Sequence, residues 1–199
     1  MVVRMVAAAL NVETVRSERV ELVWLSPELI EALLEGRREE AARIGGFLIP
    51  PGFPDEHDRR FLRLRLRQTK QDPSRGPWYV RAIVLPDGDR PMIGHIGFHG
   101  APGVNSRRDP DAVEVGYTIF PEHRRRGYAT EAVRALLAAA EAQGIHRFVA
   151  SVGPENEPSL AIVRRLGFVE VGRHWDDEDG EELEFELIVN GSTGEAGAA

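Results

Sequence analysis

The chain has 199 residues, of which 42% are hydrophobic and 29% charged, as in a folded globular protein long enough to bury a core. It contains no cysteine, which excludes disulfides, thiolate metal ligands and a cysteine nucleophile. The formal net charge of −7 argues against direct nucleic-acid binding, because such affinity comes from an excess of Lys and Arg.

The ends of the chain carry no convincing targeting segment. The apolar stretch 5–10 is too short for the hydrophobic region of a secretory signal, and polar residues follow it at once. No apolar run approaches the roughly 18 residues of a membrane span. We therefore expect a cytoplasmic protein without membrane contact. Its single domain should cover residues 12–190, with an N-terminal extension at 1–11 and a flexible tail at 191–199.

The first half of the chain predicts strands and helices separated by long loops. Residues 20–24 alternate weakly and predict a strand, and Ser26 and Pro27 then begin a helix with an apolar stripe to Leu34. The Gly- and Pro-rich stretch 45–58 predicts a loop. The elements expected after it are a basic helix at 61–71, strands at 78–85, 92–99 and 113–120, a turn at 86–89 and a loop at 101–111.

The second half has clearer periodicity. Apolar residues at i, i+3, i+4 and i+7 from Ala129 predict an amphipathic helix that Gly144 ends. A buried strand at 148–152, a helix from Asn156 to Gly167, and strands at 168–172 and 182–189 around an acidic turn follow. This order predicts an α/β (α+β) protein with a mixed sheet flanked by helices.

The segment PEHRRRGYATE, between a strand and the helix from Ala129, carries the most chemical information. Its small residues Gly127 and Ala129 expose helix N-terminal N–H groups, which lack intrahelical partners and favour anions. Arg124, Arg125 and Arg126 add positive charge, so the segment suits a diphosphate. The alternative is a solvated basic turn, since neither a Walker ending nor a G-x-G-x-x-G pattern is present.

Several motifs in order resemble the Gcn-related N-acetyltransferase (GNAT) superfamily, most closely its ribosomal-protein alanine N-acetyltransferase branch. The pattern [QR]-x-x-G-x-[GA] falls on Arg124, Gly127 and Ala129, and the strand EVGYTI precedes it. Asn156, Ser159 and the tripeptide Leu-Gly-Phe at 166–168 follow at the family's spacing. The resemblance runs from Val12 to Val189.

This resemblance implies a GNAT fold whose splayed central strands hold acetyl-CoA as co-substrate, without a metal. The main chain of one central strand would pair with the pantetheine arm. Amides at the start of the following helix would hold the pyrophosphate, and Asn156 would position the arm or serve only as a helix cap. The implied cofactor-binding residues are Tyr117, Thr118, Ile119, Arg124, Arg125, Arg126, Gly127, Tyr128, Ala129, Thr130 and Asn156.

One position departs from the family pattern. Many members carry a tyrosine three residues before the Leu-Gly-Phe tripeptide, where it protonates the departing thiolate, and this chain has Val163 there. A thiol has a pKa near 8.5, so its thiolate leaves at neutral pH with little assistance. The ribosomal branch often lacks this tyrosine, and Ser159 is a further candidate for a direct role.

The candidate general base is Glu114, a carboxylate within a strand expected to lie in the core. The alternative is a solvated strand-end glutamate. His95 and His99 lie on another central strand and are either packing residues or members of a proton relay. An α-amine with a pKa of about 8 needs only a weak base.

For the acceptor, the sequence leaves several readings open. The loop 45–58 and the acidic turn 176–182 with Trp175 are where this fold shapes its acceptor groove, although such a turn also suits a solvated hairpin tip. A protein or peptide α-amine leads as the acceptor, and a small-molecule amine such as an antibiotic or polyamine follows. The alternative from a different functional class is a regulatory module that binds CoA without catalysing a reaction. A homodimer is possible at the level of the fold.

Overall fold

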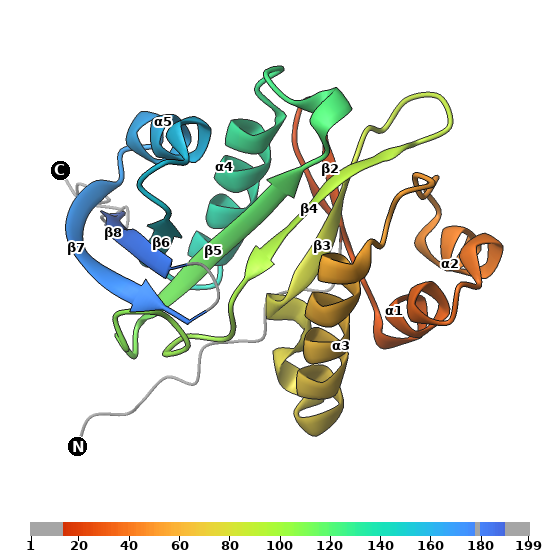
Figure 1. Ribbon diagram of the computed structural model, residues 1–199, viewed down its shortest axis with the longest axis horizontal. Helices are drawn as coiled ribbons and strands as arrows, with labels where there is room; N and C mark the ends of the chain where they lie inside the picture. Colours follow the sequence, from red (N-terminus) through yellow and green to blue (C-terminus); the bar gives the residue numbers. More distant parts are fainter. Residues whose placement is uncertain (1–13, 178–179, 190–199) are drawn as a thin grey trace, which may run out of the picture.

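The computed structural model describes residues 14–177 and 180–189, so the extension expected at 1–11 and the tail expected at 191–199 lie outside the described residues. The described strands form one mixed sheet in the order β1-β2-β3-β4-β5-β6-β8-β7 (Figure 1). Every neighbouring pair is antiparallel except β5 and β6. The strands are β1 (Val15–Arg16), β2 (Glu21–Trp24), β3 (Val80–Val84), β4 (Met92–Phe98), β5 (Ala112–Ile119), β6 (Arg147–Val152), β7 (Val169–Asp176) and β8 (Gly180–Ile188).

Helices cover both faces of this sheet, which confirms the predicted α/β architecture. Ser26 accepts a hydrogen bond from the N–H of Leu29 and so caps the first helix as predicted. Asn156 likewise caps the last helix by accepting from the N–H of Ser159 at 3.3 Å. The α-helices are α1 (Pro27–Leu34), α2 (Arg38–Gly45), α3 (Glu56–Gln71), α4 (Tyr128–Glu141) and α5 (Glu157–Arg165), and the 3₁₀ turns are η1 (Pro73–Trp78) and η2 (Pro121–His123).

The structure differs from the sequence-based expectation mainly between residues 36 and 80. Helix α2 was not expected, because Ala41 is its one fully buried residue and so gives no apolar stripe. Helix α3 begins at Glu56 rather than Phe61, since Asp55 and Asp58 form a reciprocal capping box. The loop prediction for 45–58 is therefore wrong at Gly45, the last residue of α2, and at its last three residues.

Two smaller differences concern strand ends. The strand expected from Trp78 begins at Val80, because the preceding residues form η1. The hairpin of β7 and β8 is longer than expected, since β7 continues to Asp176 and β8 begins at Gly180. Most of the predicted acidic turn therefore belongs to strands.

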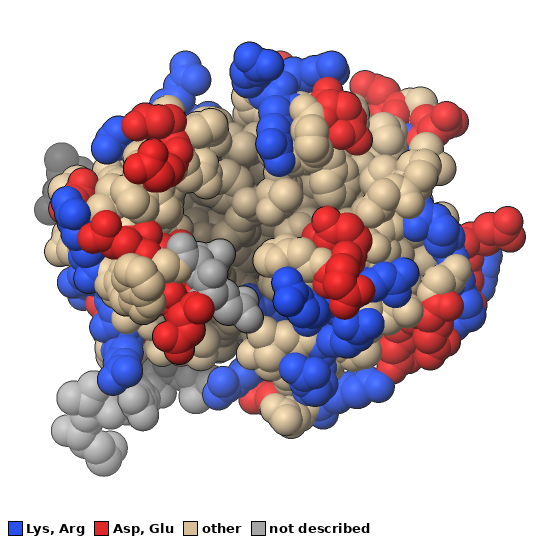
Figure 2. All heavy atoms as spheres, viewed as in Figure 1, with Lys and Arg blue, Asp and Glu red and all other residues tan. Residues whose placement is uncertain are grey.

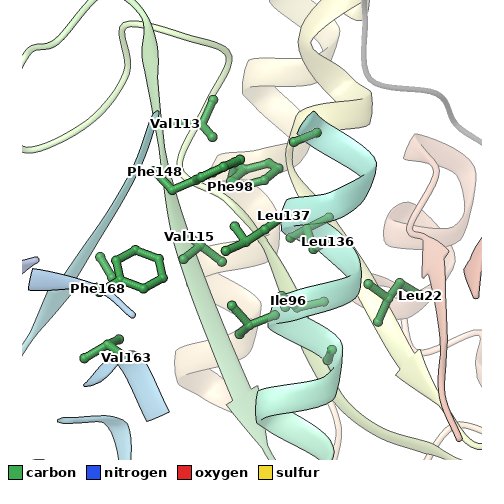
Figure 3. Packing of buried hydrophobic residues seen from close by; sticks show 14 of the residues in the cluster. Leu22, Ile96, Phe98, Val113, Val115, Leu136, Leu137, Phe148, Val163 and Phe168 are labelled. Atoms are coloured by element: carbon green, nitrogen blue, oxygen red, sulfur yellow. The ribbon is translucent and has the colours of Figure 1, made fainter. Parts of the chain in front are cut away.

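Two apolar clusters fix the helices on the sheet. On one face α4 and α5 pack on β4, β5 and β6, where Phe98, Phe148 and Leu136 are almost wholly buried (Figure 3). On the other face α1, α2 and α3 pack on β3 and β4 through residues such as Leu29 and Leu62. All five residues of β3 are buried, as expected for a strand covered on both faces.

The central strands β5 and β6 separate part-way along their length. Their parallel ladder pairs Ala112 with Arg147, Val113 with Phe148 and Glu114 with Val149, and it ends there. Strand β5 continues beside β4 as far as Ile119, while β6 continues beside β8 as far as Val152. The sheet therefore opens between the two strands, which confirms the predicted splay.

Within the described ranges 14–177 and 180–189, no helix has the length and hydropathy needed to cross a bilayer.

Candidate active site

The opening between β5 and β6 is a cavity of about 330 Å³. A second hollow of about 560 Å³ adjoins it and shares Gly153 and Asn156 with it. In Figure 2 the surface is hollowed between the part that carries α5, β7 and β8 on the left and the part that carries α3 on the right. The cavity is lined by Val115, Gly116, Tyr117, Ala150, Ser151, Val152, Gly153, Asn156, Ser159 and Glu182.

Tyr117 lines the cavity and carries a buried hydroxyl without a hydrogen-bond partner in the described part of the chain. Its hydroxyl is buried and makes no hydrogen bond of acceptable geometry with the described residues. Burial raises the pKa of Tyr117, and the nearby Ser159 hydroxyl opposes that shift. The Ser159 hydroxyl therefore lies near the phenol without forming a hydrogen bond to it. A buried hydroxyl without a partner costs free energy, which a polar ligand atom that reached it would recover.

Helix α4 begins beside the end of β5 with its first N–H groups free of helical partners. The first helical bond runs from the N–H of Glu131 to the carbonyl of Gly127 at 3.1 Å, so the N–H groups of Tyr128, Ala129 and Thr130 precede it. Gly127 is the N-cap in a left-handed conformation (φ 82°) and has no side chain to satisfy them. The arrangement predicted for an anion is therefore present at this helix start.

The three consecutive arginines before this helix have different environments. Arg124 turns back, and its Nε donates to the carbonyl of Ile119 at 2.8 Å, which ties the loop to the end of β5. Arg125 adopts a left-handed conformation (φ 59°), which is uncommon for a residue other than glycine. Arg125 and Arg126 are exposed and supply the positive charge of this loop.

Glu114, the predicted base, is buried at the point where the strands separate, with 3% of its side chain exposed. Its Oε1 accepts from the Ser151 hydroxyl at 2.6 Å, and its Oε2 accepts from the N–H of Ser106 at 2.6 Å. Both carboxylate oxygens therefore already have donors. Ser106 and Ser151 were not predicted, because nothing in the local sequence marks a serine in a loop or a neighbouring strand that will bond to this carboxylate.

His99 connects Glu114 to the surface. Its Nδ1 lies 3.6 Å from Glu114 Oε1, and 47% of its side chain is exposed. A Cβ built on Gly116, which lines the cavity, would lie 3.0 Å from His99 Nε2, so the ring reaches the cavity wall. Arg65 donates to the His99 carbonyl at 2.8 Å and fixes this end of β4 against α3. At 3.6 Å this contact is an ion-pair distance rather than a hydrogen bond, and it places a carboxylate beside the imidazole.

His95 has a packing role. Its ring stacks on Phe61 with centroids 5.5 Å apart, and its Nε2 lies 3.4 Å from Asp58. The pKa of Asp58 lies below its ordinary value: burial raises it, but the hydrogen bond to His95 and other donors outweigh burial. The contact therefore holds the start of α3 on β4.

Val163 and Ser159 lie on the same helix in different surroundings. Val163 is 1% exposed and packs in the core near Phe168 (Figure 3), so this position offers no proton donor. Ser159 lines the cavity, as does the helix cap Asn156. Of the remaining predicted cofactor residues, Thr118 is exposed and pairs with His95 across β4 and β5.

Carboxylates from β8 border the opening. Glu182 lines the cavity, and Glu184 is 8% exposed with its Oε2 3.5 Å from Arg107. His174 lies 3.4 Å from Glu182 and 3.6 Å from Glu184. The sequence analysis did not single out Glu184, although the alternation of glutamates at 182, 184 and 186 marks one face of a strand. Across the described residues there is no cluster of three or more His, Cys, Asp or Glu that could hold a metal ion.

Comparisons with known proteins agree with this architecture. The family model of the acetyltransferase (GNAT) domain matches residues 19–169, and the chain belongs to this family. A Bacillus subtilis (strain 168) protein, uncharacterized N-acetyltransferase YnaD, is 30% identical over 106 residues, which are 48% of this chain and 58% of that protein. A second B. subtilis (strain 168) relative, YoaA, is 35% identical over 82 residues, 41% of this chain and 44% of its own length. The matched segments thus span about half of each relative.

Solved structures show the same fold. A Salmonella typhimurium acetyltransferase, described as modifying the N-terminal serine of ribosomal protein L7/L12, superposes with a TM-score of 0.59 at 18% identity, covering 89% of this chain and 100% of that one. The microcin C7 self-immunity acetyltransferase MccE, solved with acetyl-CoA and AMP, gives a TM-score of 0.58 at 16% identity, covering 87% and 94%.

Proposed function

We propose that this chain is an N-acetyltransferase that moves the acetyl group of acetyl-CoA to a primary amine, and that the acceptor is the α-amine of a protein or peptide such as a ribosomal protein. One observation carries the proposal: a single opening in the sheet has unsatisfied helix N–H groups at one end and a buried carboxylate at the other. Membership of the GNAT family supports the same activity.

The opening fits acetyl-CoA along its length. The main-chain N–H groups from Arg125 to Thr130, with the charges of Arg125 and Arg126, would hold the diphosphate. The free edge of β5 over Tyr117, Thr118 and Ile119 would pair with the amide-bearing pantetheine arm, as an added strand pairs with a sheet. Arg124 would act by holding the end of β5, and Asn156 lines the wall opposite.

The reaction then proceeds by direct attack within a ternary complex. The neutral amine attacks the thioester carbonyl carbon, a C–N bond forms, the C–S bond breaks, and the electron pair leaves on sulfur as a thiolate. The proton lost by the amine passes to His99 Nε2, and Glu114 at Nδ1 stabilises the resulting imidazolium. Val163 supplies no proton, so the thiolate takes one from solvent; with a thiol pKa near 8.5 this is not a barrier.

The weak base favours an α-amine over a lysine. Deprotonating an α-amine of pKa about 8 at pH 7 costs about 1.4 kcal/mol, whereas a lysine ε-amine near 10.4 costs about 4.6 kcal/mol. A partly exposed histidine suffices for the first and is poorly matched to the second. Glu155, Glu181 and Glu182, which line the two hollows, would attract the positively charged amine.

A peptide panel tests this proposal. Peptides with a free N-terminus and no lysine are compared with the same peptides blocked at the N-terminus and given one internal lysine, alongside polyamines and aminoglycosides. We expect CoA thiol release and a mass gain of one acetyl group with the free N-termini only. Turnover confined to lysine or to the small amines would contradict the acceptor. CoA binding with no thiol release from any amine would instead identify a regulatory module.

A further inference from the structure

Arg19, in the turn between β1 and β2, contacts the loop that begins α4. Its NH1 donates to the carbonyl of Arg126 at 3.1 Å, and its guanidinium lies over the ring of Tyr128, 5.2 Å from the centroid. A Cβ built on Gly127 would lie 3.3 Å from Arg19 NH2. Arg19 thus contacts three consecutive residues, Arg126, Gly127 and Tyr128, where the loop ends and α4 begins, more than 100 residues later in the chain.

Glu131 holds this arginine in place. Its carboxylate accepts from the Nε of Arg19 at 2.7 Å, from the N–H of Arg19 at 2.7 Å and from the Ser17 hydroxyl at 2.7 Å. Burial raises the pKa of Glu131, but these donors outweigh it and the pKa lies below its ordinary value of 4.5. The carboxylate is therefore charged at neutral pH, and its Oε2 holds the guanidinium at 2.7 Å from Nε and 2.6 Å from NH2.

The loop requires such support because its backbone is unusual. Arg125 and Gly127 both have positive φ, 59° and 82°, and the carbonyl of Arg126 between them is the atom that Arg19 binds. A non-glycine residue in this conformation is held there at a cost by its surroundings. Anion binding by main-chain N–H groups depends on their being aimed before the ligand arrives.

We propose that Arg19 is a positioning residue for acetyl-CoA: it acts through the Arg126 carbonyl and the packing under Gly127 to keep the N–H groups of residues 125–130 aimed at the diphosphate. This inference rests on the proposed diphosphate seat. It assigns Arg19 no contact with the thioester or the amine. Its effect should therefore be confined to the part of the co-substrate that carries the phosphates.

The test compares Arg19→Gln with Arg16→Gln as a matched control. Arg16 lies three residues away, and its Nε bonds Glu21 at 3.0 Å, a similar ion pair that does not involve the loop. Each variant is assayed with acetyl-CoA and with acetyl-pantetheine, a thioester without diphosphate or nucleotide. Calorimetry with CoA is run in parallel, so that affinity is measured even if turnover is slow.

We expect Arg19→Gln to raise the KM for acetyl-CoA and the Kd for CoA about tenfold, to leave kcat within about twofold, and to leave kcat/KM for acetyl-pantetheine unchanged. Arg19→Lys should behave in the same way, because it retains the charge but not the fork that spans Glu131 and the loop. Arg16→Gln should match the wild type throughout.

Three results would overturn the inference. An equal loss with both thioesters would show a general structural role. An unchanged KM and Kd in Arg19→Gln would show that the loop keeps its conformation without Arg19. Full rescue by Arg19→Lys would show that long-range charge suffices. If the wild type turns over neither thioester while CoA still binds, the proposed function fails, yet the calorimetric comparison still decides the role of Arg19.

Discussion

At the scale of single residues, the site depends on how Glu114 is connected. A buried carboxylate with donors on both oxygens is held in one orientation, and its remaining neighbour is the exposed imidazole of His99. The prediction that Glu114 lies buried in a core strand is confirmed, and its role as a base stays a prediction. The sequence left His99 open between packing and proton transfer, because the pairing of β4 with β5 that brings them together is a property of the sheet.

The first prediction at this scale concerns Glu114→Gln. We expect kcat to fall about 100-fold at pH 7 with unchanged CoA affinity, because the imidazolium loses its counter-charge. The deficit should shrink above about pH 8, where the acceptor α-amine is already neutral. Glu170→Gln, on the exposed edge strand β7, is the control and should leave kcat unchanged. A Glu114→Gln enzyme with wild-type kcat at pH 7 would exclude the proposed role of Glu114 as the counter-charge of His99.

At the scale of elements, apolar periodicity and capping residues predicted the helices that carry these signals in their own sequence. The apolar stripe of α4 and the caps at Ser26 and Asn156 lie where expected. Helix α2 was missed because it is stabilised by tertiary contact with α1 rather than by its own pattern. The Arg19–Glu131 connection was missed because its partners are 112 residues apart and no local pattern relates them.

The prediction at the scale of elements concerns acid stability. Since the pKa of Glu131 is lower in the folded protein than its ordinary value of 4.5, its contribution is present above about pH 4.5 and is lost as the pH falls through the folded pKa. Glu131→Gln should therefore lower the free energy of unfolding at pH 7, and the difference from wild type should shrink towards pH 3.

Denaturant unfolding at the two pH values measures this difference. Glu141→Gln, at the other end of α4, is the control and should not reproduce it, because a negative charge near a helix C-terminus is not favourable. A wild-type-to-variant difference for Glu131→Gln that is the same at pH 3 and pH 7 would show that the carboxylate charge contributes nothing.

At the scale of the whole molecule, the opening in the sheet brings the proposed diphosphate site and the candidate catalytic carboxylate together. Helix α4 begins beyond the C-terminal end of β5, and Glu114 lies five residues before that end, Ile119, at the last pair with β6. The fold class and this opening could be predicted because motifs of the GNAT family occur in order along the chain. Glu182, which lines the cavity, falls within the acidic turn predicted at 176–182, whereas Glu184 was not predicted, because its surroundings form only once β7 and β8 have paired.

Calorimetric titration of CoA onto Gly127→Asp, with Gly144→Asp as control, tests the central claim most directly. Both glycines have left-handed φ values, 82° and 86°, at the two ends of α4, and aspartate tolerates that conformation better than most residues. The account predicts no measurable heat for Gly127→Asp, because a carboxylate then stands where the diphosphate binds, and wild-type affinity for Gly144→Asp. Wild-type affinity in Gly127→Asp would place CoA elsewhere and contradict the account.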